Sequence, residues 1–206
     1  MIVETLTVGA VQANCYLIGC EKTGAGIIID PGDEAARILQ AVQSRGLKIG
    51  HILLTHAHFD HFMAAKAVVE ATGAPLALHP DDLPLLQTGG GATAFGLPMP
   101  PIPAPEIRLA EGDVIPCGTL NFRVLHTPGH APGHVCFFEP EQGAIFVGDV
   151  LFAGSIGRTD LPGGSYETLM DSIAHKLMTL PDDTVVYPGH GPRTTIGAER
   201  VGNPFL

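Results

Sequence analysis

The segment THAHFDH, residues 55–61, places four potential metal ligands within six residues. They are His56, His58, Asp60 and His61. Imidazole and carboxylate groups together are typical of Zn²⁺ or Fe²⁺ sites, whereas Ca²⁺ and Mg²⁺ prefer oxygen ligands alone. Four ligands crowded on one short loop cannot all bind the same tetrahedral ion. We therefore expect further ligands from other parts of the chain.

Three later segments each carry one such ligand beside glycine or proline, which allow a loop to approach a metal closely. They are His130 in TPGHAPGH, Asp149 in FVGDVLF and His190 in YPGHGP. The six terminal ligands divide into two sites, His56, His58 and His130 in the first and Asp60, His61 and His190 in the second. Asp149 would bridge the ions, because a carboxylate has two oxygens. Each ion then keeps an open position for a shared water, as a catalytic site requires.

Two divalent ions in this arrangement predict metal-dependent hydrolysis, with zinc as the expected metal and iron or manganese as alternatives. Such ions lower the pKa of a bridging water toward about 7, so that a metal-bridging hydroxide attacks the carbonyl and a metal stabilises the oxyanion. We expect Asp60 to be the catalytic residue that orients this hydroxide. Arg158 would bind a substrate carboxylate, or else form a buried ion pair with Asp160.

We expect the other histidines and the cysteines to have structural roles. Isolated histidines usually lie on the surface or in the core, and this role is assigned to His51, His79, His126, His134 and His175. The four cysteines form no CxxC pair and are expected to be reduced thiols, with a Cys15–Cys20 disulfide as the alternative.

Short buried strands that end in turns, together with helices, are predicted to position these ligands. Strands are expected at residues 2–8, 15–18, 26–30, 51–54, 76–78, 121–125, 135–138, 144–147 and 184–187. Helices are expected at residues 33–45, 64–71 and 166–178. Strands followed by a helix, twice over, predict an α/β fold with two sheets back to back and helices outside.

The stretch from residue 81 to residue 105 has no periodic pattern and contains GGG and five prolines between Pro98 and Pro105. A long irregular stretch inside a compact domain is often functional. We expect a lid over the site or, alternatively, a surface linker.

The composition is that of a compact globular protein, with 45% hydrophobic and 16% charged residues among 206. This length predicts a single domain, residues 1–206. The net charge of −10 and the lack of a Lys/Arg cluster argue against nucleic acid or a membrane as partner and favour a small molecule. The start does not resemble a signal peptide and no apolar run could span a membrane, which predicts a cytoplasmic protein, either a monomer or a small homo-oligomer.

Several motifs together resemble the metallo-β-lactamase superfamily and, within it, the glyoxalase II-related branch. They are NCYL (14–17), IIDPG (28–32), LLTHAHFDH (53–61), TPGH (127–130), GDVLF (148–152), GRTD (157–160), YPGHG (187–191) and NPFL (203–206). The resemblance implies a four-layer αβ/βα sandwich with a dinuclear site at one edge and the ligand division given above. It also implies hydrolysis of thioesters such as S-lactoylglutathione, the substrate of hydroxyacylglutathione hydrolase. Asp30 would brace the metal-binding loops, or alternatively only end a strand in a turn.

The resemblance also has departures. Two tyrosines that contact glutathione in glyoxalase II correspond to Asp160 and Pro192, whereas Arg158 keeps a basic contact, and the helical extension of that enzyme has no counterpart before Leu206. Flavodiiron oxygen reductases carry Glu where His58 stands, and lactamases of the superfamily generally lack a bridging aspartate. RNA-processing members of the superfamily add basic elements that this sequence lacks.

Three alternatives remain. Iron-dependent persulfide dioxygenases have a similar GRTD segment and would use one iron held by His56, His130 and Asp149. A lactonase would use the same hydroxide on an ester. A non-catalytic metal-binding or scaffold protein would have closed, coordinatively saturated sites.

Overall fold

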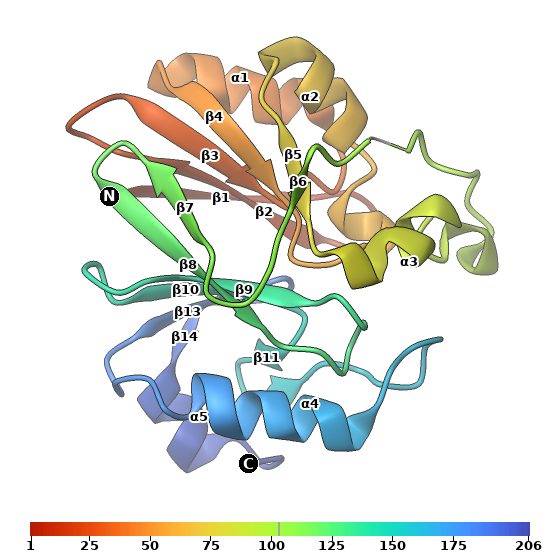
Figure 1. Ribbon diagram of the computed structural model, residues 1–206, viewed down its shortest axis with the longest axis vertical. Coiled ribbons are helices and arrows are strands. Elements are labelled where there is room, and N and C mark those ends of the chain that lie inside the picture. The colour runs from red at the N-terminus through yellow and green to blue at the C-terminus, as the bar shows by residue number, and fades with distance from the viewer. Residues whose placement is uncertain (103) are drawn as a thin grey trace.

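The computed structural model describes residues 1–102 and 104–206, which form two β-sheets packed face to face with helices on both outer sides (Figure 1). The layers follow one another as helix, sheet, sheet and helix. This is the four-layer αβ/βα sandwich expected from the sequence.

The first sheet has six strands in the order β1-β2-β3-β4-β5-β6. Their bounds are β1 Ile2–Val8, β2 Ala13–Gly19, β3 Ala25–Ile29, β4 Lys48–Leu53, β5 Leu76–Leu78 and β6 Ile107–Arg108. The pairs among β1, β2 and β3 are antiparallel, whereas β3 to β6 run parallel. Ile27, Ile28 and Ile29 of β3 are fully buried, because both faces of this strand are covered.

The second sheet also has six strands, in the order β14-β13-β10-β9-β8-β7. Their bounds are β7 Val114–Cys117, β8 Leu120–His126, β9 Val135–Glu139, β10 Ala144–Gly148, β13 Val185–Pro188 and β14 Thr194–Thr195. β10 and β13 are parallel and the other pairs are antiparallel. A two-stranded hairpin, β11 Leu151–Phe152 and β12 Ser155–Ile156, follows β10.

The outer layers are helical (Figure 1). Helices α1 (Ala35–Arg45) and α2 (Ala65–Thr72) cover the first sheet, and α4 (Tyr166–Ser172) and α5 (Ile196–Gly202) cover the second. Fully buried side chains of each helix pack inward, among them Ile38, Val68, Leu169 and Ile196. Apolar residues at helical spacing therefore build the outer cores, as their pattern predicts.

Aromatic rings join the two sheets. Phe146 of β10 is fully buried, and its ring lies edge-on to Tyr16 of β2 with 5.1 Å between the ring centroids. The same ring stacks on Tyr187 of β13 at 4.8 Å. Because β2 and β10 belong to different sheets, these contacts stabilise the sandwich as a whole.

The stretch 81–105 differs from the expectation of irregular structure. It begins within a 3₁₀ turn, Pro80–Asp82, and contains α3 (Leu83–Gln87) and a second 3₁₀ turn, Ala92–Phe95; Pro103 lies outside the described residues. These helices are too short for a hydrophobic period to reveal. In Figure 1 the segment after α3 projects to the right of the sandwich.

Other differences also concern short elements. Strands β6, β7, β11, β12 and β14 have two to four residues each and escape prediction, because so few residues show no alternation. The closing helix α5 also has no expected counterpart. The helix expected at residues 166–178 is present, but Ile173–Leu177 forms a π-helical turn.

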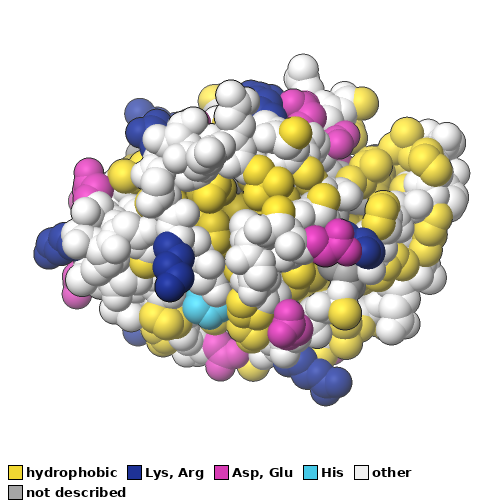
Figure 2. Space-filling model, turned by 90° about the horizontal axis from the view of Figure 1, so that it is seen from above, with side chains coloured by type: hydrophobic (Ala, Val, Ile, Leu, Met, Phe, Trp, Pro, Cys, Tyr) yellow, Lys and Arg dark blue, Asp and Glu magenta, His cyan; other side chains and the backbone are white. Residues whose placement is uncertain are grey.

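The four cysteines are buried and free, so the structure supports reduced thiols rather than a Cys15–Cys20 disulfide. Within residues 1–102 and 104–206, no helix has the length and apolar character needed to cross a membrane. On the face shown in Figure 2, Lys and Arg side chains are scattered among Asp and Glu, while hydrophobic side chains gather on the right, where the segment after α3 projects.

Replacing Phe146 with alanine should lower the free energy of unfolding by about 3–5 kcal/mol, because the change leaves a cavity between the sheets. Urea unfolding measures this loss. Phe205, whose side chain is 47% exposed, is the matched control, and its replacement by alanine should change stability by less than about 0.5 kcal/mol. Equal losses in the two variants would contradict the role given to Phe146.

Candidate metal centre

The candidate site lies at the edge of the sandwich where parallel strands of both sheets end. Asp30 follows β3 directly, and the loop that carries His56 follows β4. Asp149 follows β10, and His190 lies two residues beyond β13. The carboxyl ends of parallel strands meet at one edge of a sheet, which brings together residues far apart in the chain.

The structure brings all seven predicted ligands together. The ligand atoms of His56, His58 and His130, the first group, lie within 4.8 Å of one another, as do those of Asp60, His61 and His190, the second group. Within the first group, His58 Nδ1 lies 2.9 Å from His130 Nε2. Within the second, His190 Nε2 lies 3.2 Å from Asp60 Oδ2. These two groups correspond to the two sites that the sequence predicts.

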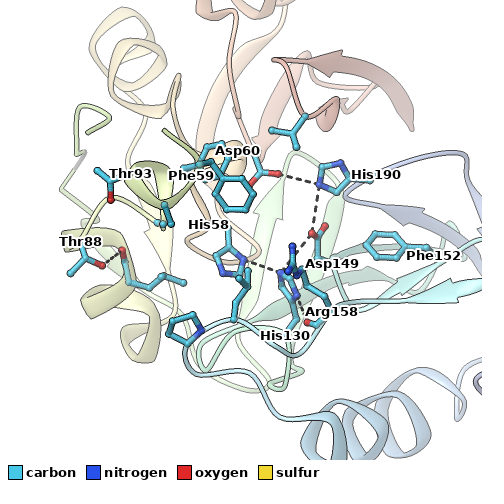
Figure 3. A pocket seen from close by; sticks show the side chains of 18 of the residues that line it. His58, Phe59, Asp60, Thr88, Thr93, His130, Asp149, Phe152, Arg158 and His190 are labelled. Atoms are coloured by element: carbon cyan, nitrogen blue, oxygen red, sulfur yellow. Dashed lines mark hydrogen bonds and ion pairs between the residues drawn. The ribbon is translucent and has the colours of Figure 1, made fainter. Parts of the chain in front are cut away.

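Asp149 lies between the two groups (Figure 3). Its Oδ2 is 3.6 Å from Nε2 of His130 and 3.6 Å from Nε2 of His190, and its Oδ1 is 3.5 Å from Nε2 of His61. Gly189 leaves room for this carboxylate, because a Cβ at that position would collide with Asp149 Oδ1. The carboxylate thus faces both groups at once, the position that a bridging ligand needs.

Three histidines are oriented by hydrogen bonds on the side away from the centre. His56 Nδ1 lies 3.0 Å from Thr55 Oγ1. His61 Nδ1 lies 3.0 Å from Asp30 Oδ2, and His130 Nδ1 lies 2.8 Å from the carbonyl oxygen of Arg158. Carboxylate and carbonyl oxygens only accept, so Nδ1 of His61 and of His130 carries the proton. Their Nε2 lone pairs then face the centre, as in metal-binding histidines.

Asp30 combines both roles that the sequence left open. It ends β3 in a left-handed conformation, with φ of 51°. Its Oδ1 accepts from the backbone N–H of Thr55 at 2.7 Å, and its Oδ2 accepts from the Thr55 hydroxyl at 2.6 Å and from His61. The turn therefore also braces the loop that begins at Thr55.

The centre contains buried polar atoms that have no hydrogen-bond partner in the described part of the chain: His56 Nε2, His61 Nε2 and Asp149 Oδ1. Buried polar atoms are nearly always paired, because an unpaired one costs about 1–3 kcal/mol. The ligand atoms of these three residues lie within 4.8 Å of one another. This donor set fits divalent metal ions, which would take up these lone pairs.

The two groups differ in charge. Burial, reinforced by neighbouring histidines, holds the pKa of His56 well below its ordinary value and lowers the pKa of His58 to about 3. Burial also opposes charge on His61 and His190, but carboxylates, Asp60 foremost, outweigh it and raise both pKa values. His56 and His58 are therefore neutral near pH 7, whereas His61 and His190 hold protons more tightly.

Asp82 is a residue of the site that sequence reasoning missed. It is fully buried, and its Oδ2 accepts from the backbone N–H of Ala57 at 2.8 Å. Its Oδ1 accepts from the backbone N–H of Gly133 at 2.6 Å. One carboxylate thus ties the loop of His58 to the loop of His130. A single aspartate in a stretch without periodic pattern carries no signal of this role.

The NCYL motif holds the loop that carries His190. Asn14 Nδ2 donates to the carbonyl oxygens of Pro188 at 3.1 Å and Gly191 at 2.9 Å. The Tyr16 hydroxyl donates to the same Pro188 oxygen at 2.5 Å. Strand β2 of the first sheet therefore fixes a loop of the second.

Other histidines have structural contacts. His134 Nε2 accepts from the backbone N–H of Asp149 at 3.1 Å, so its Nδ1 donates to Thr127 Oγ1 at 3.0 Å. The rings of His79 and His126 stack, with 4.2 Å between their centroids and an angle of 10° between their planes. Their in-plane lone pairs run parallel and do not converge on one point, although Asp81 lies close enough to complete a three-ligand group.

A cavity of about 640 Å³ opens in front of the centre, and five of the seven predicted ligands line it, namely His58, Asp60, His130, Asp149 and His190 (Figure 3). Arg158 also lines it. Arg158 forms a bidentate ion pair with Asp160, with both N–O distances 2.7 Å. The side chains are 52% and 67% exposed, so this pair is not the buried one considered from the sequence.

Comparisons with known proteins agree with this geometry. The family model described as "Metallo-beta-lactamase superfamily" matches residues 8–190. The hydroxyacylglutathione hydrolase GloC of Haemophilus influenzae is 43% identical over 209 aligned residues, which cover 100% of this chain and 98% of the relative.

Two solved structures resemble the chain over nearly its whole length. The BLEG-1 B3 metallo-beta-lactamase superposes with a TM-score of 0.94 at 38% identity, covering 100% of this chain and 99% of that one. TTHA1623 in a di-iron-bound form has a TM-score of 0.91 at 48% identity, covering 99% of this chain and 100% of that one.

Acidification should release metal from the second group before the first. A histidine whose pKa is raised takes up a proton at higher pH, and protons compete with metal for the same lone pair. Metal content after dialysis against fixed free metal, between about pH 8 and about pH 5, should fall in two steps. Loss of both ions in one step, or loss from the first group first, would contradict this order.

Asp82→Asn should lower the free energy of unfolding by about 1–3 kcal/mol and reduce bound metal, because an amide can accept from only one of the two backbone N–H groups. Chemical unfolding and elemental analysis measure the two effects. Asp81→Asn is the matched control, since the Asp81 side chain is 59% exposed. An Asp82→Asn protein with unchanged stability and metal content would refute the assigned role.

Proposed function

Since the chain belongs to the metallo-beta-lactamase superfamily, we propose that it is a dinuclear metallohydrolase that cleaves thioesters or related acyl compounds. The position of Asp149 between two complete groups of ligand atoms carries this proposal. The name of the Haemophilus influenzae relative supports a thioester substrate, and the di-iron form of TTHA1623 supports a site for two ions. Zinc is the proposed metal, with iron or manganese as alternatives.

In this proposal the first group holds one ion, the second group holds the other, and Asp149 binds both. Bound ions would supply an activated water and stabilise negative charge on the carbonyl oxygen of the substrate. The low pKa of His56 and His58 keeps these imidazoles neutral and available as ligands.

Asp60 is the proposed catalytic residue. Burial alone would raise its pKa, but His61 and the hydrogen bond from His190 lower it, so it is a carboxylate at neutral pH. It also lines the cavity, where it can accept a hydrogen bond from the attacking water and orient it. A thiolate leaving group has a pKa near about 8.5 and needs little protonation, so no separate acid is required.

A persulfide dioxygenase is the second candidate, because His56, His130 and Asp149 lie together and could hold a single iron. The GRTD segment supports it as well, since its Arg158 carbonyl orients His130. Metal stoichiometry and substrate separate the two functions. One iron per chain with oxygen uptake on a persulfide would favour the dioxygenase.

Asp149→Ala should remove most bound metal, because both ions would lose a ligand. It should also lower kcat/KM for thioester substrates at least about 100-fold. Elemental analysis and a panel of thioester, lactone, persulfide and β-lactam substrates test this. Asp171→Ala, at a carboxylate with 76% exposure, is the control and should behave as the parent protein. An Asp149→Ala protein with two ions per chain and full turnover would overturn the proposal.

A further inference from the structure

The cavity in front of the metal centre is walled mostly by carbon. One wall comes from Phe59 and from Leu85 and Phe95 of the segment around α3. Phe152 of the β11–β12 hairpin lies across the centre from Phe59 (Figure 3) and forms the opposite wall. Leu161, in the loop that follows the hairpin, also lines the cavity. Apart from the predicted metal ligands, few polar side chains reach this space.

Large apolar side chains are exposed at the rim of the same cavity. Phe95 is 53% exposed and Val11 is 46% exposed, and both line the opening. The Phe95 ring lies over Phe59, which is only 5% exposed, with 5.3 Å between the ring centroids. Exposed apolar surface around a cavity marks a place where an apolar group binds.

The charge of the cavity does not match an anionic carrier. Among the described residues that line it, Arg158 is the only Lys or Arg, and Asp160 already pairs with it in bidentate fashion. Glutathione carries two carboxylates and one ammonium group. Its carboxylates therefore find no unpaired Lys or Arg side chain among the described residues that line the cavity.

We infer that the site takes uncharged acyl compounds, that is, neutral thioesters, esters or lactones, whose apolar substituent packs between the Phe59–Phe95 wall and the hairpin wall. This inference rests on the proposed hydrolase function and names its substrate class. Phe95 is then a specificity-determining residue, because substrate binding would cover its exposed ring.

Two substrate series test the inference with the metal-loaded protein. In thioesters of the neutral thiol N-acetylcysteamine, kcat/KM should rise about two- to fourfold for each added methylene from acetyl to hexanoyl. For one acyl group, the neutral thioester should be at least as good a substrate as the glutathione thioester. A flat or falling series, or a preference of more than about tenfold for the glutathione carrier, would overturn the inference.

Phe95→Ala should lower kcat/KM about fivefold for the hexanoyl substrate and less than about twofold for the acetyl substrate. Phe205→Ala, at a residue with 47% exposure that does not line the cavity, should change neither. Equal losses for both substrates in Phe95→Ala would contradict a role in specificity.

Calorimetric binding of S-alkyl thioether analogues, which cannot be hydrolysed, separates this inference from the proposed function. Tighter binding of the longer analogue, lost in Phe95→Ala, upholds the apolar site even if no acyl compound is turned over. Turnover of acyl compounds without any dependence on chain length upholds the hydrolase and refutes the apolar site.

Discussion

The gathering of five imidazoles and two carboxylates in one small space, where all but Asp60 and His190 are buried, is the constraint on which the rest of the structure depends. Among the described residues, His61 Nε2 and Asp149 Oδ1 have no hydrogen-bond partner, so the fold holds together buried polar groups that bound cations would stabilise. Hydrogen bonds from neighbouring side chains hold the loops that carry these groups. Asp30 and Asp82 both anchor the loop of residues 55–61, and Asp82 also anchors the loop of His130. Asn14 anchors the loop of His190.

Much of this arrangement is predictable from the sequence, because local signals coincide with it. The apolar run that ends at Asp30 predicts a buried strand, and the ligand types of residues 56–61 predict a metal loop in any fold. The four-layer sandwich follows from the order of strands and helices and from the family motifs. The strand, the metal loop and the sandwich can be predicted because each depends on residues that are neighbours in the sequence or on motifs that recur at strand ends.

What the sequence does not reveal depends on contacts between distant residues. The role of Asp82 arises from backbone N–H groups 25 and 51 positions away, which no local pattern records. The stretch 81–105 shows the same limit. Its composition indicates an irregular loop, yet Asp82 anchors two metal-binding loops while Phe95 forms a wall of the cavity. A plain surface linker does not account for these contacts, and the expectation of a lid stays a prediction.

The hydrogen bonds from Asn14 to the loop of His190 join residues 174 and 177 positions apart. The second group of ligands is thus complete only when the two sheets have docked, since His61 comes from one half of the chain and His190 from the other. During synthesis, the growing chain can offer His56, His58, Asp60 and His61 long before their partners exist. Under the proposed function, loading with both ions would therefore be a late event that reports a finished fold, and it would lock the two halves together as a cross-link between them does.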